Sequence, residues 1–502
     1  MLAALKVWLS ELLSSPPALP RMRLGPESNP DNALMLQFFT WDTLNSEMSW
    51  WKHLESEIPK LAEMGFTQVW LPPPNKGAQP RLVDKYEAIF KGTVKTRWGT
   101  RDELLQACKV AAAHGIDIII DAVLNHKLGG DRVERFPAVP VDSQNRLKDE
   151  GPVREIEGWT VFDFKGRGNK YSSFRWTHEH FTGLDWDHKT RTNAIYRIAS
   201  KGRKGWSQHV AKELGNYDYL LGVDTIDTWA DVQNDLMNWG VWILETTGAA
   251  GFRLDAIKHM DYRFLFRFVS ASDRKFAIRV LVSRVGFRSV CQPSRPNHTS
   301  HSLKLILPYI KAFRGETAFF DVPLHSNFHQ ASKDHSHYDL RNILNSTIVK
   351  ARPKDAVTFV DNHDTVIGQS LESWVDANFK IQAYSLILLR QDGHPCVFYG
   401  DLYPNEEGYD ANVSRNLTLL IEARKKFAYG PCHDYFQEPK CIGNKEVQTE
   451  NFTHTIRMFV GREHAGSVFH TFMNPYGSIN IDAGGWGEFS CPANRVEVWV
   501  RS

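Results

Sequence analysis

Long apolar segments and paired cysteines are missing from this chain of 502 residues. No run reaches 18 apolar residues, so a membrane-spanning helix is not expected. The 6 cysteines form no CxxC pair and no metal-type spacing, which argues against a zinc site and a dense disulfide framework. The net charge of +2 gives no long-range attraction for nucleic acid. We therefore expect a globular, monomeric, cytoplasmic protein with reduced thiols that binds neither nucleic acid nor membranes.

The first 33 residues precede the regular pattern of the chain. They begin MLAALKVWLSELLSSPPALP, which has an apolar face at helical spacing. Lys6 and Glu11 interrupt that face, and no basic region precedes it. The segment 1–33 is therefore interpreted as a short amphipathic helix with a proline-rich linker in preference to a secretory signal.

From about residue 34, short β-branched runs alternate with longer amphipathic stretches, which is typical of βα units around a parallel sheet. The expected strands are Met35–Phe39, Thr67–Leu71, Ile116–Val123, Gly251–Asp255, Phe319–Val322, Ala356–Val360 and Cys396–Tyr399. The expected helices include Trp51–Met64, Arg101–His114, Val232–Thr247 and Ala377–Leu389. The pattern predicts an α/β fold.

Two intervals depart from this alternation. Residues 127–221 are rich in glycine, aromatic and charged residues without a strong helical period, so we expect an inserted, irregular domain. Residues 429–502 contain short alternating segments, which predict a small antiparallel β domain. Its expected strands are His454–Val460, Ser467–Phe472, Gly487–Ser490 and Arg495–Val500. The ranges 34–126 and 222–428 remain for the main body.

Four polar strings follow expected strands or lie in the insertion. They are Asp121-Ala-Val-Leu-Asn125-His126, Gly251-Phe-Arg253-Leu-Asp255-Ala-Ile-Lys258-His259, Phe359-Val-Asp361-Asn-His363-Asp364 and Asn216-Tyr-Asp218-Tyr-Leu-Leu-Gly-Val-Asp224. Singly, each also has a structural interpretation, because such residues often cap helices or satisfy backbone groups. Side chains two apart in a strand face the same way, so Arg253 would keep Asp255 ionised. An ionised carboxylate there could act as a nucleophile.

Taken in order, DAVLNH, GFRLDAIKH and FVDNHD resemble the α-amylase family, glycoside hydrolase family 13, in its intracellular fungal and bacterial liquefying type. GFTQVWLPPP, KGTVKTRWGT, GNYDYL, FFDVPLH, VFYGD and GWGEF support the resemblance over roughly residues 34–500. It implies a (β/α)8 TIM barrel, called domain A, with an inserted domain B and a C-terminal antiparallel β-sandwich, domain C. It also implies retaining hydrolysis of internal α-1,4 bonds in an α-glucan such as starch or glycogen.

The resemblance also assigns site residues. Asp255 would be the catalytic nucleophile, and Asp364 would hold the distorted sugar and stabilise its developing charge. The implied substrate-binding residues are His126, Arg253, Lys258, His259 and His363. The alternative for the histidines is a purely structural role.

Calcium is the cofactor that the resemblance implies. Asn125, Asp218, Asp224 and the main-chain carbonyl of His259 would bind it, since calcium takes several oxygen ligands. Solvated surface carboxylates are the alternative interpretation. Thr182 and Ser207 replace acidic residues that create a second metal site in some bacterial relatives, so a single calcium ion is expected.

The chain departs from the family pattern where the acid catalyst belongs. Residues 274–315 contain no Asp and no Glu, and Glu316 comes too late. The basic segment Phe276–Leu303 stands in place of the expected fifth strand. A retained intron or a loss of the acid site would each produce this. Besides an α-amylase, a catalytically silent glucan-binding protein and a glucanotransferase therefore remain open.

A second departure lies at Gln79–Phe90, where the family carries a tyrosine that stacks under the cleaved sugar. Two interpretations stay open in this chain: Tyr86 takes that place, or the stacking tyrosine is lost.

Overall fold

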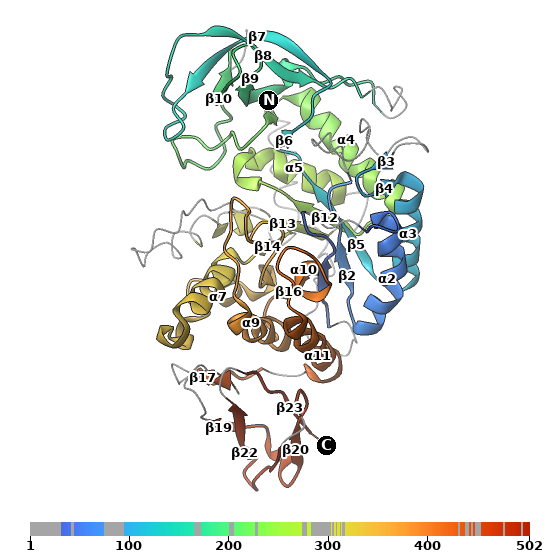
Figure 1. The fold of residues 1–502 in the computed structure, drawn as a ribbon, viewed down its shortest axis with the longest axis vertical. Coiled ribbons are helices and arrows are strands. Elements are labelled where there is room, and N and C mark those ends of the chain that lie inside the picture. Colours follow the sequence, from blue (N-terminus) through green and yellow to red (C-terminus); the bar gives the residue numbers. More distant parts are fainter. Residues whose placement is uncertain are drawn as a thin grey trace, which may run out of the picture.

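The computed structural model describes most of the chain from Asn32 to Arg501 (Figure 1). The described residues are 32–41, 45–74, 95–164, 172–199, 205–225, 229–273, 279–282, 303, 306–307, 309–311, 313, 317–429, 432–436, 441–442, 445–446, 453–474, 477–492 and 495–501. The expectations for residues 1–31, for Gln79–Phe90 and for Glu316 lie outside them.

Eight parallel strands close into a barrel in the order β1-β16-β15-β14-β13-β12-β5-β2. The strands are β1 (Met35–Gln37), β2 (Gln68–Trp70), β5 (Asp117–Ala122), β12 (Gly251–Leu254), β13 (Arg279–Val282), β14 (Thr317–Phe320), β15 (Ala356–Phe359) and β16 (His394–Phe398). A parallel barrel is covered by helices outside and filled by side chains inside, which explains its apolar strands. The predicted (β/α)8 fold is confirmed.

The fifth barrel strand, β13, lies inside the basic segment Phe276–Leu303. Its backbone pairs with β12, from Gly251 opposite Arg279 to Leu254 opposite Val282, and also with β14. The expectation that this segment replaces the strand was wrong, because strand pairing uses main-chain hydrogen bonds, which every residue except proline can donate. The strand sequence is Arg-Val-Leu-Val, which supplies no carboxyl group.

The helices surround the barrel (Figure 1). They are α2 (Trp50–Met64), α3 (Arg101–Ala113), α4 (Ala230–Thr247), α5 (Tyr262–Asp273), α7 (Val322–Asp334), α8 (Ile348–Ala351), α9 (Ala377–Leu389), α10 (Tyr399–Leu402) and α11 (Ala411–Phe427). Local sequence sets several ends. Thr100 and Glu103 form a capping box at the start of α3, and Gly65 ends α2 in the left-handed region at φ 102°. Among these described helices, none is both long and apolar enough to cross a membrane.

Strand ends differ from the prediction where an aspartate terminates the strand. We expected a strand to run through Val322, but it ends at Phe320 because Asp321 caps α7. The Asp321 carboxylate accepts hydrogen bonds from the backbone N–H of Leu324 and of Ile348, both 3.1 Å long. Such side-chain caps compete with strand pairing and are weak signals in sequence.

The inserted segment forms a six-stranded antiparallel sheet in the order β6-β11-β9-β10-β7-β8. Its strands are β6 (His126–Lys127), β7 (Arg132–Val141), β8 (Arg154–Val161), β9 (Phe181–Asp187), β10 (Thr192–Ile198) and β11 (Val223–Thr225). The expectation of an irregular domain was therefore wrong. Its glycines reflect close packing: a Cβ on Gly183 would lie 2.7 Å from the Trp206 ring.

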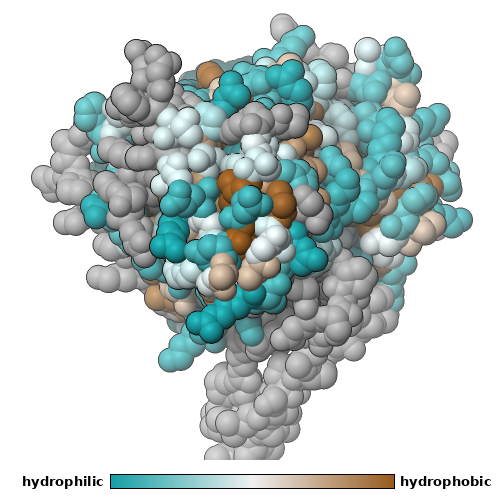
Figure 2. Space-filling model, turned by 90° about the horizontal axis from the view of Figure 1, so that it is seen from below, coloured by the Kyte–Doolittle hydropathy of each residue, from teal (hydrophilic) through white to brown (hydrophobic). Residues whose placement is uncertain are grey.

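Short antiparallel strands make up the C-terminal part, at the end of the molecule opposite the inserted sheet (Figure 1). They are β17 (Cys441–Ile442), β18 (Lys445–Glu446), β19 (Thr453–Phe459), β20 (Val468–Thr471), β21 (Ser478–Asn480), β22 (Trp486–Pro492) and β23 (Trp499–Arg501). A hairpin of β3 (Lys95–Thr96) and β4 (Gly99–Thr100) precedes α3. Figure 2 views the C-terminal end, where polar residues surround a small apolar cluster. The predicted antiparallel character is confirmed, whereas the exact domain boundaries stay predictions.

Candidate active site

Three of the four polar strings meet at the carboxyl ends of the barrel strands. Asp121 lies near the end of β5, Asp255 follows β12, and the segment from Asp361 to Asp364 follows β15. Active sites of such barrels lie at this end of the strands. Residues distant in the sequence are therefore neighbours here.

Arg253 connects the acidic groups of this site. Its side chain is 4% exposed, and Nη1 donates to Asp121 Oδ1 at 3.0 Å and to Oδ2 at 2.9 Å. Nη2 lies 3.1 Å from Asp255 Oδ1. The Trp70 indole N–H also donates to Asp121 Oδ2, at 3.0 Å. Asp255 therefore has a fixed cation beside it, in a position that its neighbours determine.

The electrostatics of this group follow from burial. Burial raises the pKa of Asp121 to about 7, although the positive charge of Arg253 opposes the shift. Burial also disfavours the charged form of Arg253, but the carboxylates of Asp121, Asp255 and Asp364 outweigh it and raise its pKa. The guanidinium remains charged and is the local source of positive potential.

His363 and Asp364 lie beside this group. His363 Nε2 is 3.4 Å from Asp364 Oδ2, and the Gln37 amide donates to His363 Nδ1 at 3.0 Å. That bond requires an unprotonated Nδ1, so in neutral His363 the proton is on Nε2, facing Asp364. The Trp41 ring centroid lies 5.1 Å from that of His363, and Trp41 is 41% exposed. Trp41 therefore offers an accessible aromatic surface next to the histidine.

His126 lies at the start of the inserted sheet. Burial lowers its pKa, although the charge of Asp255 opposes the shift. Its buried Nδ1 has no hydrogen-bond partner among the described residues. A neutral ring with a spare nitrogen is suited to bind a hydroxyl group.

Lys258 and His259 contact the inserted segment. Lys258 Nζ is 2.7 Å from Glu213 Oε2 and 4.2 Å from the centre of the Tyr217 ring. His259 Nδ1 donates to the Tyr217 carbonyl at 2.6 Å, and burial lowers its pKa well below the usual value. Both side chains are buried, so their substrate-binding role stays a prediction.

The predicted metal ligands lie where the inserted sheet meets the barrel. Asn125 Nδ2 and Thr182 Oγ1 donate to the two carboxylate oxygens of Asp224, each at 2.8 Å. The backbone N–H of Ser207 donates to Asp218 Oδ2 at 3.1 Å. Both carboxylates are buried, and burial raises the pKa of Asp218 to about 7.

Only two of the four predicted calcium ligands, Asp218 and Asp224, are acidic side chains; the others are the amide of Asn125 and the main-chain carbonyl of His259. Among the described residues, no group of three or more His, Cys, Asp or Glu side chains is placed to hold a metal ion. Two carboxylates, an amide oxygen and a main-chain carbonyl are nevertheless a donor set that a hard cation accepts.

Sequence reasoning missed Gln37, Trp41 and Trp70 as site residues. Gln37 had a detectable signal, since it is the one polar residue in the expected strand MLQFF. Trp41 and Trp70 had none, because aromatic residues in this chain are mostly core.

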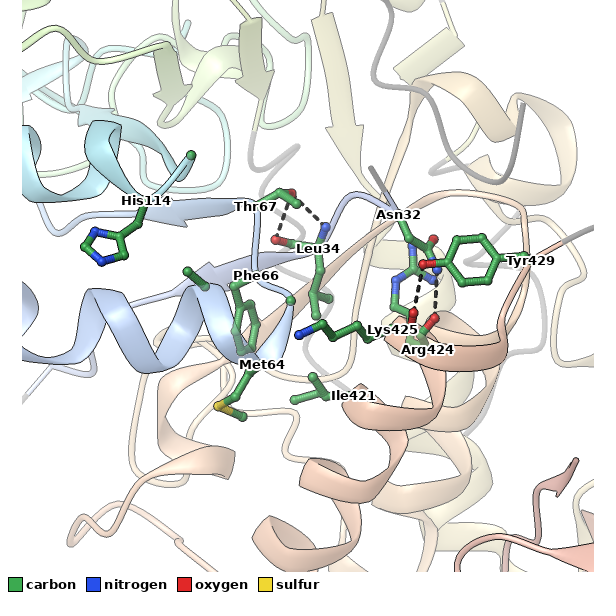
Figure 3. Close-up of a pocket in the computed structure, with 13 residues that line it drawn as sticks. Asn32, Leu34, Met64, Phe66, Thr67, His114, Ile421, Arg424, Lys425 and Tyr429 are labelled. Carbon is green, nitrogen blue, oxygen red and sulfur yellow. Dashed lines mark hydrogen bonds between the residues drawn. The ribbon is translucent and has the colours of Figure 1, made fainter. Parts of the chain in front are cut away.

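A separate cavity of about 320 Å³ lies at the opposite ends of the strands (Figure 3). It is lined by Leu34, Thr67 and Gly115, which precede β1, β2 and β5, and by Arg424 and Lys425 of α11. It is therefore remote from Asp255 and Asp364 and takes no part in the candidate site.

The fold and site thus define a (β/α)8-barrel protein with buried acidic groups around an arginine at the carboxyl ends of its strands. Residues 39–275 match the family model described as the catalytic domain of alpha amylase. An alpha-amylase of Geobacillus stearothermophilus is 37% identical over 98% of this chain and 90% of its own length. The cytoplasmic alpha-amylase of Escherichia coli is 31% identical, over 93% of this chain and 99% of its own. The chain belongs to the α-amylase family of glycoside hydrolases.

Solved structures agree on the fold. The crystal structure of an alpha-amylase from Geobacillus thermoleovorans, complexed with acarbose, superposes with a TM-score of 0.58. It covers 94% of this chain and 98% of its own, at 16% identity.

Proposed function

We propose that this chain is an α-amylase-type retaining hydrolase that acts on internal α-1,4 bonds of starch- or glycogen-like glucans. The observation that carries the proposal is Asp255, placed 3.1 Å from the buried Arg253 at the carboxyl end of a barrel strand. The guanidinium lies directly beside this carboxylate, and a carboxylate is the group that attacks carbon in covalent catalysis of this kind. Family membership over nearly the whole chain supports the same conclusion.

In the proposed reaction, Asp255 Oδ attacks the anomeric carbon while the bond from that carbon to the glycosidic oxygen breaks. A glycosyl ester of Asp255 forms, and water later replaces it with retention of configuration. Asp364 and His363 hold hydroxyl groups of the reacting sugar, and His126 accepts or donates a further hydrogen bond. Lys258 and His259 are proposed on the leaving-group side.

The departing oxygen needs a proton, and the usual donor is a carboxylic acid. Residues 274–315 contain no Asp and no Glu, so the fifth strand cannot supply one. General acid catalysis contributes about 10²–10⁴-fold in rate. We therefore propose that this chain keeps the catalytic nucleophile but has lost most of the rate enhancement that protonation of the leaving group would provide.

Calcium is the proposed cofactor, bound by Asn125, Asp218, Asp224 and the carbonyl of His259. The fit rests on the chemistry of the donor set, since two buried carboxylates, an amide and a main-chain carbonyl offer the oxygen ligands that calcium takes. A bound calcium ion would join the inserted sheet to the barrel.

A glucan-binding protein without turnover is the second candidate, favoured by the missing acid. A glucanotransferase, which uses a sugar in place of water as acceptor, shares the same site residues. A location in the cytoplasm is also proposed, because the related Escherichia coli protein is named as cytoplasmic. A monomeric state is proposed as well.

The test uses α-maltosyl fluoride, whose fluoride leaves with little need of protonation. We expect the chain to release fluoride and to accumulate a glycosyl ester on Asp255, because hydrolysis of that ester also uses the missing acid group as a base. Peptide mass spectrometry locates the ester. Asp255→Asn should abolish it, whereas the control Asp482→Asn, in the C-terminal part, should keep it. An unmodified wild-type chain that still binds maltoheptaose supports the glucan-binding candidate.

A further inference from the structure

A buried ammonium group joins the segments that follow the last two barrel strands. Lys380, in α9, has a side chain that is 2% exposed. Its Nζ lies 2.9 Å from Asp361 Oδ2 and 2.7 Å from Asp401 Oδ1. Asp361 follows β15, and Asp401 lies in α10, directly after β16. The indole of Trp374 covers the ammonium, with its ring centre 3.0 Å away.

From Asp361 a chain of hydrogen bonds leads to the backbone of Asp364. Asp361 Oδ1 accepts a hydrogen bond from the Thr365 hydroxyl at 2.8 Å. The Thr365 hydroxyl oxygen in turn accepts a hydrogen bond from the Asn362 backbone N–H at 3.0 Å. Asn362 Oδ1 then accepts from the backbone N–H of Asp364 at 2.8 Å. Asp361 Oδ2 also accepts from the Val375 N–H at 3.3 Å, so the same carboxylate holds both ends of the segment.

The second carboxylate is fixed equally firmly. Asp401 Oδ2 accepts from the Tyr384 hydroxyl at 2.6 Å, and both Asp361 and Asp401 are buried. Burial raises the pKa of Asp361 to about 7, although the ammonium of Lys380 opposes the shift. Without Lys380 the two carboxylates would have no buried cation between them, so at least one would take up a proton.

Stability alone does not explain this charged cluster, since apolar residues of similar volume are often as stabilising as a buried ion pair. The cluster also forms directed hydrogen bonds and ion pairs, which apolar packing does not need. It fixes one particular segment, and that segment carries His363 and Asp364, beside Arg253 and Asp255.

We propose that Lys380 is a positioning residue for the candidate active site: it anchors Asp361 and Asp401, and thereby holds His363 and Asp364 in place against Arg253. The catalytic part of this inference rests on the proposed function. The structural part, an anchored segment 361–376, does not.

The first measurement is amide hydrogen exchange of the full chain, followed by mass spectrometry. In Lys380→Met, exchange of the peptide covering 361–376 should be at least about tenfold faster than in wild type, because the amide groups of Asp364 and Val375 lose their fixed acceptors. Peptides of β5 should not change. Arg424→Met is the matched control, since it also removes a buried cation, but at the opposite end of the barrel. An unchanged 361–376 peptide in Lys380→Met, or equal loosening in Arg424→Met, overturns the proposal.

The second measurement separates positioning from stability. In the triple variant Lys380→Met, Asp361→Asn and Asp401→Asn, no buried charge is left, so the melting temperature should recover towards wild type. The maximal rate of glycosylation by α-maltosyl fluoride should nevertheless stay at least about tenfold below wild type, with less than about a threefold change in half-saturating concentration. Full recovery of both rate and exchange would reduce Lys380 to a structural role and refute the proposal. A wild-type chain that does not react would contradict the proposed function, and the exchange result would still decide the role of Lys380.

Discussion

Replacing Arg253 by methionine tests the electrostatic core of the site. The substitution keeps an unbranched side chain but leaves Asp121 and Asp255 without their shared cation. At the observed 2.9 Å, the attraction between unit charges is about 6 kcal/mol for an effective dielectric constant of about 20. Removing one partner of a buried pair costs about 3–5 kcal/mol. We expect a loss of that size in the free energy of unfolding at pH 8.

The loss should depend on pH, because the pKa of Asp121 is raised to about 7 in the folded protein. At pH 6 this carboxyl is largely protonated in wild type, so less of the ion pair exists to be lost. In Arg253→Met its pKa rises further, so the folded variant keeps a proton that wild type releases above pH 7. The folded variant then binds more protons than the unfolded chain, and its stability falls relative to wild type by about 1.4 kcal/mol per pH unit. The loss at pH 8 should exceed that at pH 6 by about this amount.

Urea unfolding followed by fluorescence of the 16 tryptophans measures both losses. Arg424→Met is the control, because its guanidinium donates to the carbonyls of Ala33 and Leu388 and makes no ion pair among the described residues. Burial lowers the pKa of Arg424 to about 10, so its charge does not change between pH 6 and pH 8. Its loss should be equal at both values. An equal loss for Arg253→Met as well would refute the assignment of Asp121 as the titrating partner.

Three further outcomes are expected. Chelation by EDTA should lower the melting temperature, since calcium bound only to the folded state adds about 2.7 kcal/mol of stability at a hundredfold excess over Kd. Asp224→Asn should remove this response to EDTA, and a response that survives in the variant would reject Asp224 as a ligand. Starch hydrolysis by the wild-type chain, measured as release of reducing sugar, should be at least about a hundredfold slower than hydrolysis by a variant whose residues 274–315 are replaced by the corresponding segment of the Geobacillus stearothermophilus relative. Normal turnover by the wild-type chain would mean that another carboxyl protonates the leaving group. Gly183→Ala should cost about 1–3 kcal/mol in urea unfolding, because its Cβ would meet Trp206 at 2.7 Å, and an unaffected midpoint would show that the sheet can adjust.

The sequence was a good guide wherever short-range patterns decide the structure. Seven of the eight barrel strands lie within or next to the expected ranges, and helix α9 runs over the predicted Ala377–Leu389. Arg253 and Asp255 could be placed together because residues two apart in a strand share a face. The C-terminal strands β19, β20, β22 and β23 were found for the same reason, since their alternation is local, whereas the short strands β17, β18 and β21 were not predicted.

Pairing between segments that are distant in the sequence could not be predicted from local sequence patterns. The inserted sheet joins β6 to β11, almost a hundred residues later, and its glycines signal close packing that only the folded sheet creates. The fifth strand, β13, was not predicted from the sequence, because it pairs through its main chain with β12 and β14, and such pairing tolerates almost any sequence.

The sequence by itself therefore determined the family, the alternation of the barrel and the types of group at its strand ends. Only the tertiary structure decided which of them meet. Asp121 and Arg253 are 132 positions apart, and Gln37 and His363 are 326 apart, yet each pair is hydrogen-bonded. Lys380 shows no pattern of its own in the sequence, because a lysine on a helix is usually solvated. Closing the barrel brings the ends of β15 and β16 together beneath α9, and the resulting burial gives that one ammonium group two carboxylates to hold.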